Sequence, residues 1–317
     1  MRQSFGVHPD SHGVTGVTST TCVLVNAKAG RQRTDAIEQD LRSAFARHGR
    51  TVEIRIVRRG SHLQSAAASA VRDGFQVVVA AGGDGTLNAI ASALVKTSCV
   101  LGVLPLGTLN YFARDPGIPM ILEAAVETLL TGSLRPVNVG EVNGRIFLNN
   151  ASLGTYAGIL ETRERVYSRW GRSQLAAYWS VLLTLLHPFS PLDTTIHVGT
   201  RTMPRRTPFL FFVTNAFQLR QFGLPGTECI GSDRLACYVG PDASRFALIR
   251  QATGLLLGRL RSSRDFELLC ENDVLVSTRR RRCIVVRDGE REVMHGPYRF
   301  RLHRQALHVL VPSARLL

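Results

Sequence analysis

The stretch VVVAAGGDGTLNAI, from Val77 to Ile90, passes directly from an apolar run into three glycines, an aspartate and a threonine. The apolar run is typical of a buried strand, and the residues that follow have the pattern of a helix. Glycine lets backbone N–H groups approach a bulky anion, and a helix N-terminus carries partial positive charge. The stretch therefore predicts a strand, a phosphate-binding loop at Gly82–Thr86 and a helix, although a plain tight turn also uses glycine in this way.

Side chains in this loop suit a phosphate ligand. The Thr86 hydroxyl can cap the helix and donate to a phosphate oxygen. Asp84 can hold a cation-bound water or orient a ligand hydroxyl, and Asn88 lies one helical step further on. The loop is not a Walker A motif, because no Gly-Lys-Ser/Thr follows, and it is not GxGxxG.

A second loop of the same kind follows the next predicted strand. LPLGTLNYFARD, from Leu104 to Asp115, again places Gly-Thr at the end of an apolar run. Alternating strands and helices predict a parallel sheet with both faces covered, and ligands of such sheets bind at the carboxyl ends of the strands. With VNAKAG, Val25 to Gly30, three strand ends should line one crevice. Lys28 lies there, either to meet a phosphate or as an ordinary exposed charge.

The pattern changes after Gly132. RPVNVGEVNGRIFLNNASLG predicts a hairpin around Asn143-Gly144, and several short strands at close spacing then predict an antiparallel β domain. Two helical patterns, 160–186 and 244–260, interrupt these strands. We predict an α/β domain with a parallel sheet at 21–136 and a mainly antiparallel, β-sandwich-like domain at 137–317. Residues 1–20 lack the apolar region of a signal peptide and are predicted to be a flexible leader.

Charge is the unusual feature of the composition. Across 317 residues, 39 Lys and Arg stand against 24 Asp and Glu, a net charge of +15, which favours anionic partners such as nucleic acid, membrane surfaces or phosphorylated molecules. No apolar run is long enough to span a bilayer. The six cysteines have no CxxC spacing, so we expect reduced thiols and a cytosolic protein. They are Cys22, Cys99, Cys229, Cys237, Cys270 and Cys283.

Taken together, GGDGT, PLGTLNYFARDPGIP and, far downstream, RDGE at Arg287 to Glu290 resemble the diacylglycerol kinase catalytic-domain family. That family includes bacterial lipid kinases and sphingosine and ceramide kinases. The resemblance extends from about Cys22 to Pro312, with FLNNASLGTYA and RFRLHRQALHVLVP at corresponding places. It implies ATP bound in a cleft between two domains, with its phosphates on the first loop. The expected nucleotide contacts are Asn26, Lys28, Gly82, Gly83, Asp84, Gly85, Thr86, Asn88, Thr108 and Asn110.

The resemblance also implies a catalytic role for Asp288 and Glu290, which would supply or assist a general base, and we group Asp84 with them. A carboxylate near a lipid hydroxyl can accept its proton as the bond to phosphorus forms, while Mg²⁺ between the β- and γ-phosphates offsets negative charge. Without the resemblance, Asp288-Gly289-Glu290 is read as a hairpin turn with two solvated acids.

Two departures from the family pattern bear on ligands. Tyr111 stands where many relatives carry Asp, which leaves the nucleotide preference open. IGSDRLACYV resembles a degraded form of an element linked to a structural magnesium in bacterial relatives, although its Arg234 is unfavourable beside a metal. The implied metal ligand is Asp233, with the carbonyls of Ile230 and Leu235 and, as a substitute carboxylate, Glu228.

Two stretches bear on membrane contact. The four arginines Arg279 to Arg282, with Arg205 and Arg206 in the same domain, could bind an anionic bilayer or form a solvated hairpin. QLAAYWSVLLTLLHPF, Gln174 to Phe189, could line a lipid groove or belong to the core.

We therefore expect an ATP- and Mg²⁺-dependent lipid kinase of bacterial phospholipid biosynthesis that acts on diacylglycerol or a related hydroxyl lipid at the cytoplasmic membrane face. The alternatives are a ceramide or sphingoid-base kinase and a catalytically silent, membrane-associated nucleotide sensor. NAD kinases share GGDGT but do not combine it with the other two motifs, and no recognition helix or stacking-aromatic motif indicates nucleic-acid binding. A homodimer is left open.

Overall fold

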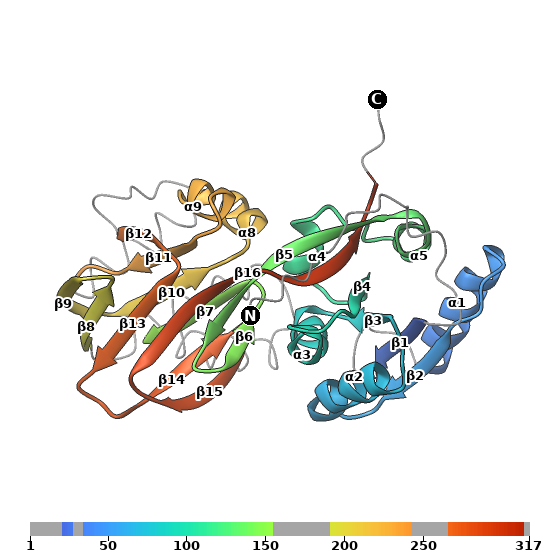
Figure 1. Cartoon of the computed structure of the whole chain (residues 1–317), viewed down its shortest axis with the longest axis horizontal. Coiled ribbons are helices and arrows are strands. Elements are labelled where there is room, and N and C mark those ends of the chain that lie inside the picture. The colour runs from blue at the N-terminus through green and yellow to red at the C-terminus, as the bar shows by residue number, and fades with distance from the viewer. Residues whose placement is uncertain (1–20, 28–33, 155–190, 243–265, 314–317) are drawn as a thin grey trace, which may run out of the picture.

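The computed structural model describes residues 21–27, 34–154, 191–242 and 266–313 (Figure 1). A parallel sheet with helices lies on the right of that view, and antiparallel strands lie on the left. The predicted fold class, an α/β domain followed by a mainly antiparallel β domain, is confirmed. Across the described ranges, no helix is both long and apolar enough to cross a membrane.

The N-terminal part is a parallel sheet between two layers of helices, with strand order β2-β1-β3-β4. Strands β1, β3 and β4 are short apolar runs, as expected of strands buried on both faces, whereas the edge strand β2 alternates charged and apolar residues. Helices α1 and α5 pack on one face through residues such as Phe45 and Leu129, and α2 and α3 pack on the other through Leu63 and Ile90. The elements are β1 (Thr21–Asn26), α1 (Thr34–Arg47), β2 (Glu53–Val57), η1 (Gly60–His62), α2 (Leu63–Arg72), β3 (Val77–Gly82), α3 (Asp84–Leu94), β4 (Val100–Pro105), α4 (Tyr111–Arg114) and α5 (Leu122–Thr131).

The second sheet is antiparallel, with strand order β12-β11-β10-β7-β14-β15. It faces strands of the first sheet across a core in which Phe212 stacks on Phe300, with ring centroids 3.6 Å apart. Three strands of this part, β13, β8 and β9, belong to the first sheet. The elements of this part are β7 (Asn150–Gly154), β8 (Leu192–Val198), β9 (Arg201–Thr207), β10 (Phe209–Val213), α8 (Ala216–Gln221), α9 (Thr227–Gly231), β11 (Leu235–Val239), β12 (Glu267–Glu271), β13 (Asp273–Thr278), β14 (Arg282–Arg287) and β15 (Glu290–His295).

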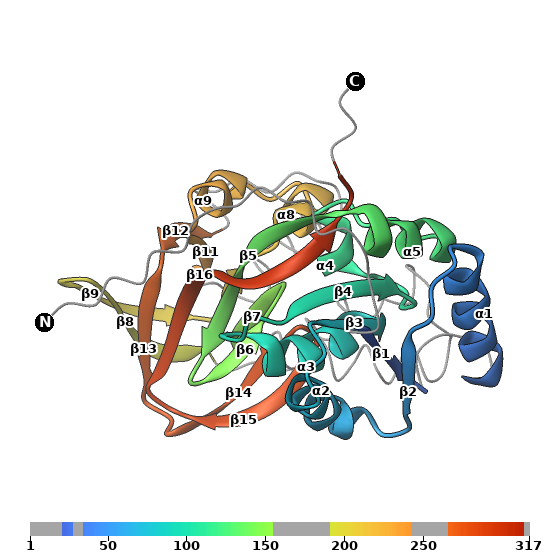
Figure 2. The same cartoon turned by 45° about the vertical axis from the view of Figure 1, so that its right-hand side comes forward.

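The last strand, β16 (Tyr298–Val311), joins the two parts. It pairs antiparallel with β5 (Ser133–Val142), and near its end it runs parallel to β4. Figures 1 and 2 show β5 and β16 side by side between the two halves of the molecule. The domain border predicted between residues 136 and 137 falls inside β5 and stays a prediction.

The predicted hairpin at Asn143 and Gly144 is confirmed, since it joins β5 to β6 (Arg145–Phe147) with φ angles of 48° and 82° at the turn. The helix predicted to follow the loop at Gly82–Thr86 begins within that loop, at Asp84. The leader, Lys28, the helical patterns at 160–186 and 244–260 and the apolar stretch 174–189 lie outside the described residues.

The expectation that all six cysteines are reduced is wrong for two of them, because Cys229 and Cys270 form a disulfide. They are 41 residues apart in the chain, so their spacing gave no signal of a pair. The fold brings them together, since α9 packs on β11 and β11 pairs with β12. The other four, Cys22, Cys99, Cys237 and Cys283, are free thiols.

Candidate active site

The two glycine loops pack directly on each other at the carboxyl ends of β3 and β4. A Cβ atom on Gly83 would lie 3.2 Å from the Cα atom of Gly107, and a Cβ atom on Gly107 would overlap Gly83. The Leu106 N–H group donates to the Gly82 carbonyl over 3.0 Å. The two backbones are thus in contact and the loops form one surface. Glycine is required at Gly107, whereas a side chain at Gly83 would have to push the second loop slightly away.

Asp84, the first residue of α3, fastens the second loop to the first. Its two carboxylate oxygens accept the backbone N–H groups of Tyr111 at 3.2 Å and Phe112 at 3.0 Å, and the Asn149 side-chain amide at 3.2 Å. These contacts hold the N-terminus of α4 and reach Asn149, the residue just before β7 in the other part of the molecule. Asp84 thus connects three segments of the site.

Two predicted nucleotide contacts, Asn26 and Asn110, have side chains bonded within the loops. Asn110, in the left-handed conformation at φ 49°, accepts from Gly107 N–H at 3.1 Å and donates to the Gly107 carbonyl at 2.8 Å. The Asn26 amide donates to Thr86 Oγ1 at 2.9 Å, and Thr86 is 4% exposed. Thr108, in contrast, is exposed at the surface of the second loop.

Asp288 and Gly289 form the turn between β14 and β15, with φ angles of 46° and 89°. The Asp288 carboxylate accepts the side-chain amide of Asn88 at 2.6 Å and the N–H groups of the segment before β7 and its first residue. Burial raises the pKa of this carboxyl, and the backbone donors act in the opposite direction. The three backbone donors are Leu148 at 2.7 Å, Asn149 at 2.8 Å and Asn150 at 3.0 Å.

The anchored turn brings Glu290 to the first glycine loop. A Cβ atom on Gly85 would lie 3.4 Å from Glu290 Oε1. Glu290 is exposed, whereas Asp288 is partly buried and bonded to four donors. The fold therefore gathers Asp84, Asp288 and Glu290 around the start of α3, with different surroundings for each.

Asn149 and Asn215 were missed by the sequence reasoning. Both are 2% exposed, and the Asn149 side-chain oxygen accepts from Asn215 Nδ2 at 2.8 Å. Asn215 also donates to the Tyr111 carbonyl at 2.9 Å and caps α8 by accepting from Gln218 N–H at 2.8 Å. The only sequence signal for Asn149 was its place in the FLNNAS stretch, which resembles the family, and no role was predicted for the residue itself.

Asp233 lies away from this site, in the turn between α9 and β11. It is exposed, its carboxylate accepts from Asn138 of β5 at 2.7 Å, and its carbonyl accepts from Arg304 of β16 at 3.4 Å. The Ile230 carbonyl is bonded to the Asp233 N–H. Magnesium requires several oxygen ligands. One carboxylate beside two arginines, Arg234 and Arg304, does not suit it, and the described ranges hold no metal-binding group of three or more His, Cys, Asp or Glu.

Comparison with known proteins fits this geometry. Residues 20–142 match the family model of the diacylglycerol kinase catalytic domain. This segment belongs to that family. Over 134 residues the chain is 39% identical to the protein named "Probable lipid kinase YegS-like" of Pseudomonas aeruginosa, covering 42% of this chain and 43% of that protein. Over 99 residues it is 43% identical to the diacylglycerol kinase of Bacillus subtilis, covering 30% and 32%.

The chain thus matches less than half the length of these curated relatives. The similarity of fold extends further than that of sequence. A crystal structure of a diacylglycerol kinase from Bacillus anthracis superposes with a TM-score of 0.67 over 95% of this chain and 99% of that one, at 15% identity. At this identity the likeness shows that the kinase-family domain and the antiparallel part together have the fold of that protein.

Proposed function

We propose that the chain is an ATP-dependent lipid kinase that transfers the γ-phosphoryl group of ATP to a lipid hydroxyl, with diacylglycerol as the acceptor. The position of Glu290 carries this proposal. Glu290 is an exposed carboxylate beside Gly85, so a lipid hydroxyl that approaches a nucleotide bound on the glycine loop would have a base next to it. A general base in this position is what phosphoryl transfer to an alcohol requires.

The backbone at the start of α3 supports phosphate binding. The Leu87 N–H group donates to the Gly83 carbonyl, so the preceding N–H groups of the helix have no carbonyl within it to bond. Such groups, together with the helix dipole, favour an anion. Thr108 is exposed on the adjoining loop and is our candidate for a further nucleotide contact.

In this proposal the three carboxylates have different roles. Glu290 accepts the proton of the lipid hydroxyl as its oxygen bonds to phosphorus. Asp288 holds the turn that carries Glu290, and Asp84 holds the second loop, because the oxygens of both are bonded to protein donors. Mg²⁺ would arrive bound to ATP and offset charge between its phosphates.

The test is transfer of labelled γ-phosphate from ATP, with Mg²⁺, to diacylglycerol, monoacylglycerol, ceramide and sphingosine, with NAD as a control acceptor. Labelled phosphatidic acid would support the proposal. Label on ceramide or sphingosine alone would show that this lipid, and not diacylglycerol, is the acceptor. Bound ATP with no labelled lipid would favour a silent nucleotide sensor. We include in this proposal that the enzyme acts at the cytoplasmic membrane face, in phospholipid biosynthesis. A homodimer stays a prediction.

Replacing Asn149 with alanine is expected to lower kcat about 10- to 100-fold with little change in ATP affinity, because the reacting groups would be misplaced. Asn149→Asp should be more harmful, since it sets a second carboxylate beside Asp84. Single-turnover kinetics and ATP titration would separate the two effects. Asn138→Ala on β5 is the matched control, and an Asn149→Ala enzyme with the kcat of the control would exclude the positioning role.

A further inference from the structure

Two groups of arginines that are far apart in the chain come together in the second part of the molecule. Arg205 and Arg206 of β9 and Arg279, just after β13, line one groove of about 590 Å³. Hydroxyl side chains of β8 and β13 line it as well. The other lining residues are Asp193, Thr194, Thr195, Pro204, Ser277 and Thr278.

Strand pairing accounts for this arrangement. β8 lies between β9 and β13, and Arg206 stands opposite Asp193 in the register of β8 and β9. The Arg279 N–H group donates to the Asp193 carbonyl at 3.2 Å, which fixes the start of the arginine run at the groove. Arg280, Arg281 and Arg282 continue the exposed run toward β14.

Charge in this region is only partly neutralised. Arg205 pairs with Glu267 at 3.1 Å, but Arg206 is 4.0 Å from both Asp193 and Asp242. Over the described ranges, Arg279, Arg280 and Arg281 form no ion pair. We call Arg205, Arg206 and Arg279–Arg282 the arginine surface.

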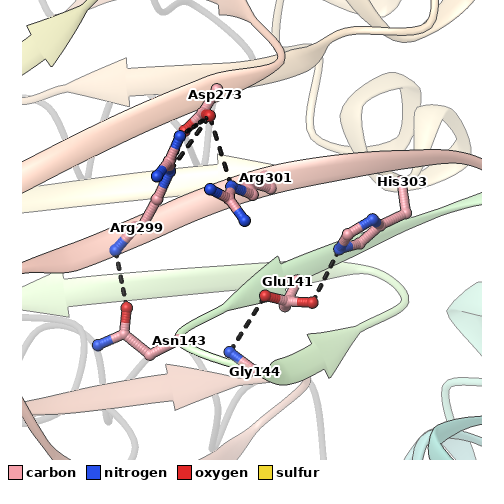
Figure 3. A network of polar contacts seen from close by, with 7 residues as sticks. All are labelled: Glu141, Asn143, Gly144, Asp273, Arg299, Arg301 and His303. Carbon is pink, nitrogen blue, oxygen red and sulfur yellow. Dashed lines mark hydrogen bonds and ion pairs between the residues drawn. The ribbon is translucent and has the colours of Figure 1, made fainter.

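Basic residues of β16, the strand next to β13, are paired with carboxylates. Figure 3 shows Asp273 between Arg299 and Arg301, with ion pairs to both, and Glu141 bonded to His303 at 2.8 Å. The Arg299 and Arg301 guanidinium groups are thus matched by the Asp273 carboxylate of β13. The arginine surface, in contrast, has few carboxylates beside it.

We propose that the arginine surface docks on the anionic phospholipid headgroups of a bilayer. Guanidinium groups bind phosphate oxygens in a forked geometry. The Thr194 and Thr278 hydroxyls of the groove already donate to the Arg205 and Arg280 carbonyls, which leaves those of Thr195 and Ser277 to donate to the same oxygens. Charge complementarity selects this partner, because an anionic leaflet presents many phosphates in one plane while the surface is broad and exposed.

The functional role of this docking rests on the proposed lipid kinase activity. β14 begins at Arg282 and ends at Arg287, immediately before the Asp288 turn. A strand rises about 3.3 Å per residue, so roughly 20 Å separates Arg282, the end of the arginine surface on β14, from the turn that carries Glu290. Docking would therefore hold the reaction centre close to a bilayer in which the acceptor is dissolved.

Co-sedimentation with phosphatidylglycerol vesicles, compared with phosphatidylcholine vesicles, tests the proposal. Each basic residue near an anionic surface contributes about 1 kcal/mol, or about fivefold, so Arg206→Ala/Arg279→Ala and Arg280→Ala/Arg281→Ala should each weaken binding about 30-fold. The control Arg50→Ala/Arg72→Ala removes two exposed arginines at helix ends of the α/β part and should change binding less than twofold.

Unchanged binding in both test variants would overturn the proposal. The proposal would also be overturned if inorganic phosphate released the wild-type chain from the vesicles more than chloride at equal ionic strength does, since that result indicates a free-phosphate site. Assays with a dispersed short-chain diacylglycerol separate the two hypotheses. If the test variants lose vesicle binding but phosphorylate this substrate at the wild-type rate, docking is supported. If the variants lose vesicle binding and even the wild type does not phosphorylate the substrate, docking stands and only the proposed kinase activity is removed.

Discussion

Replacing Glu290 with glutamine is expected to lower kcat by about 10²- to 10⁴-fold, the usual contribution of a positioned general base. Glutamine retains the shape of the side chain but cannot accept the hydroxyl proton. Because Glu290 is exposed and the turn is held by Asp288, the substitution should leave the fold and the ATP dissociation constant nearly unchanged. Single-turnover phosphoryl transfer and ATP titration on the same preparation would measure both.

A matched control is Glu127→Gln, which changes an exposed carboxylate on α5, on the other side of the α/β part. It should keep wild-type kinetics. If Glu290→Gln instead lost ATP affinity and kept kcat at saturating ATP, Glu290 would be a nucleotide ligand and the base would have to be sought elsewhere.

The N-terminal part of the fold was predictable because its signals are local. Strands β1, β3 and β4 are short apolar runs that end in asparagine, glycine and proline, and the glycine loops follow β3 and β4. The hairpin at Asn143 and Gly144 was predictable for the same reason, since both residues tolerate positive φ.

The partners of the polar side chains were not predictable. Asn88 was expected at the nucleotide, yet its amide bonds to Asp288, 200 residues away, and Asn110 bonds within its own loop. Sequence periodicity reports which residues share a strand or helix face, whereas these bonds depend on how two sheets meet. The disulfide of Cys229 and Cys270 and the passage of β16 through both parts depend on the same long-range packing.

Asp84→Ala should reduce kcat/KM by at least about 10²-fold, because displacing reacting groups by about 1 Å can have that effect. Alanine removes the acceptor of the Tyr111 and Phe112 N–H groups and of the Asn149 amide, so the second loop and β7 lose their shared anchor. Hydrogen bonds to a charged group contribute about 1.5–3 kcal/mol each, so the melting temperature should also fall.

Asp35→Ala separates this role from a general effect of an acidic residue at a helix N-terminus, because Asp35 lies in the first turn of α1 without any part in the site. Both variants lose a favourable interaction with a helix dipole of about 0.3–1 kcal/mol, but only Asp84→Ala should lose activity. Asp84→Asn, which retains one side-chain oxygen, should fall between Asp84→Ala and the wild type. Turnover of Asp84→Ala at the rate of Asp35→Ala would remove the glycine loop's aspartate from the mechanism, and the bare loop would then bind phosphate without help from the second loop.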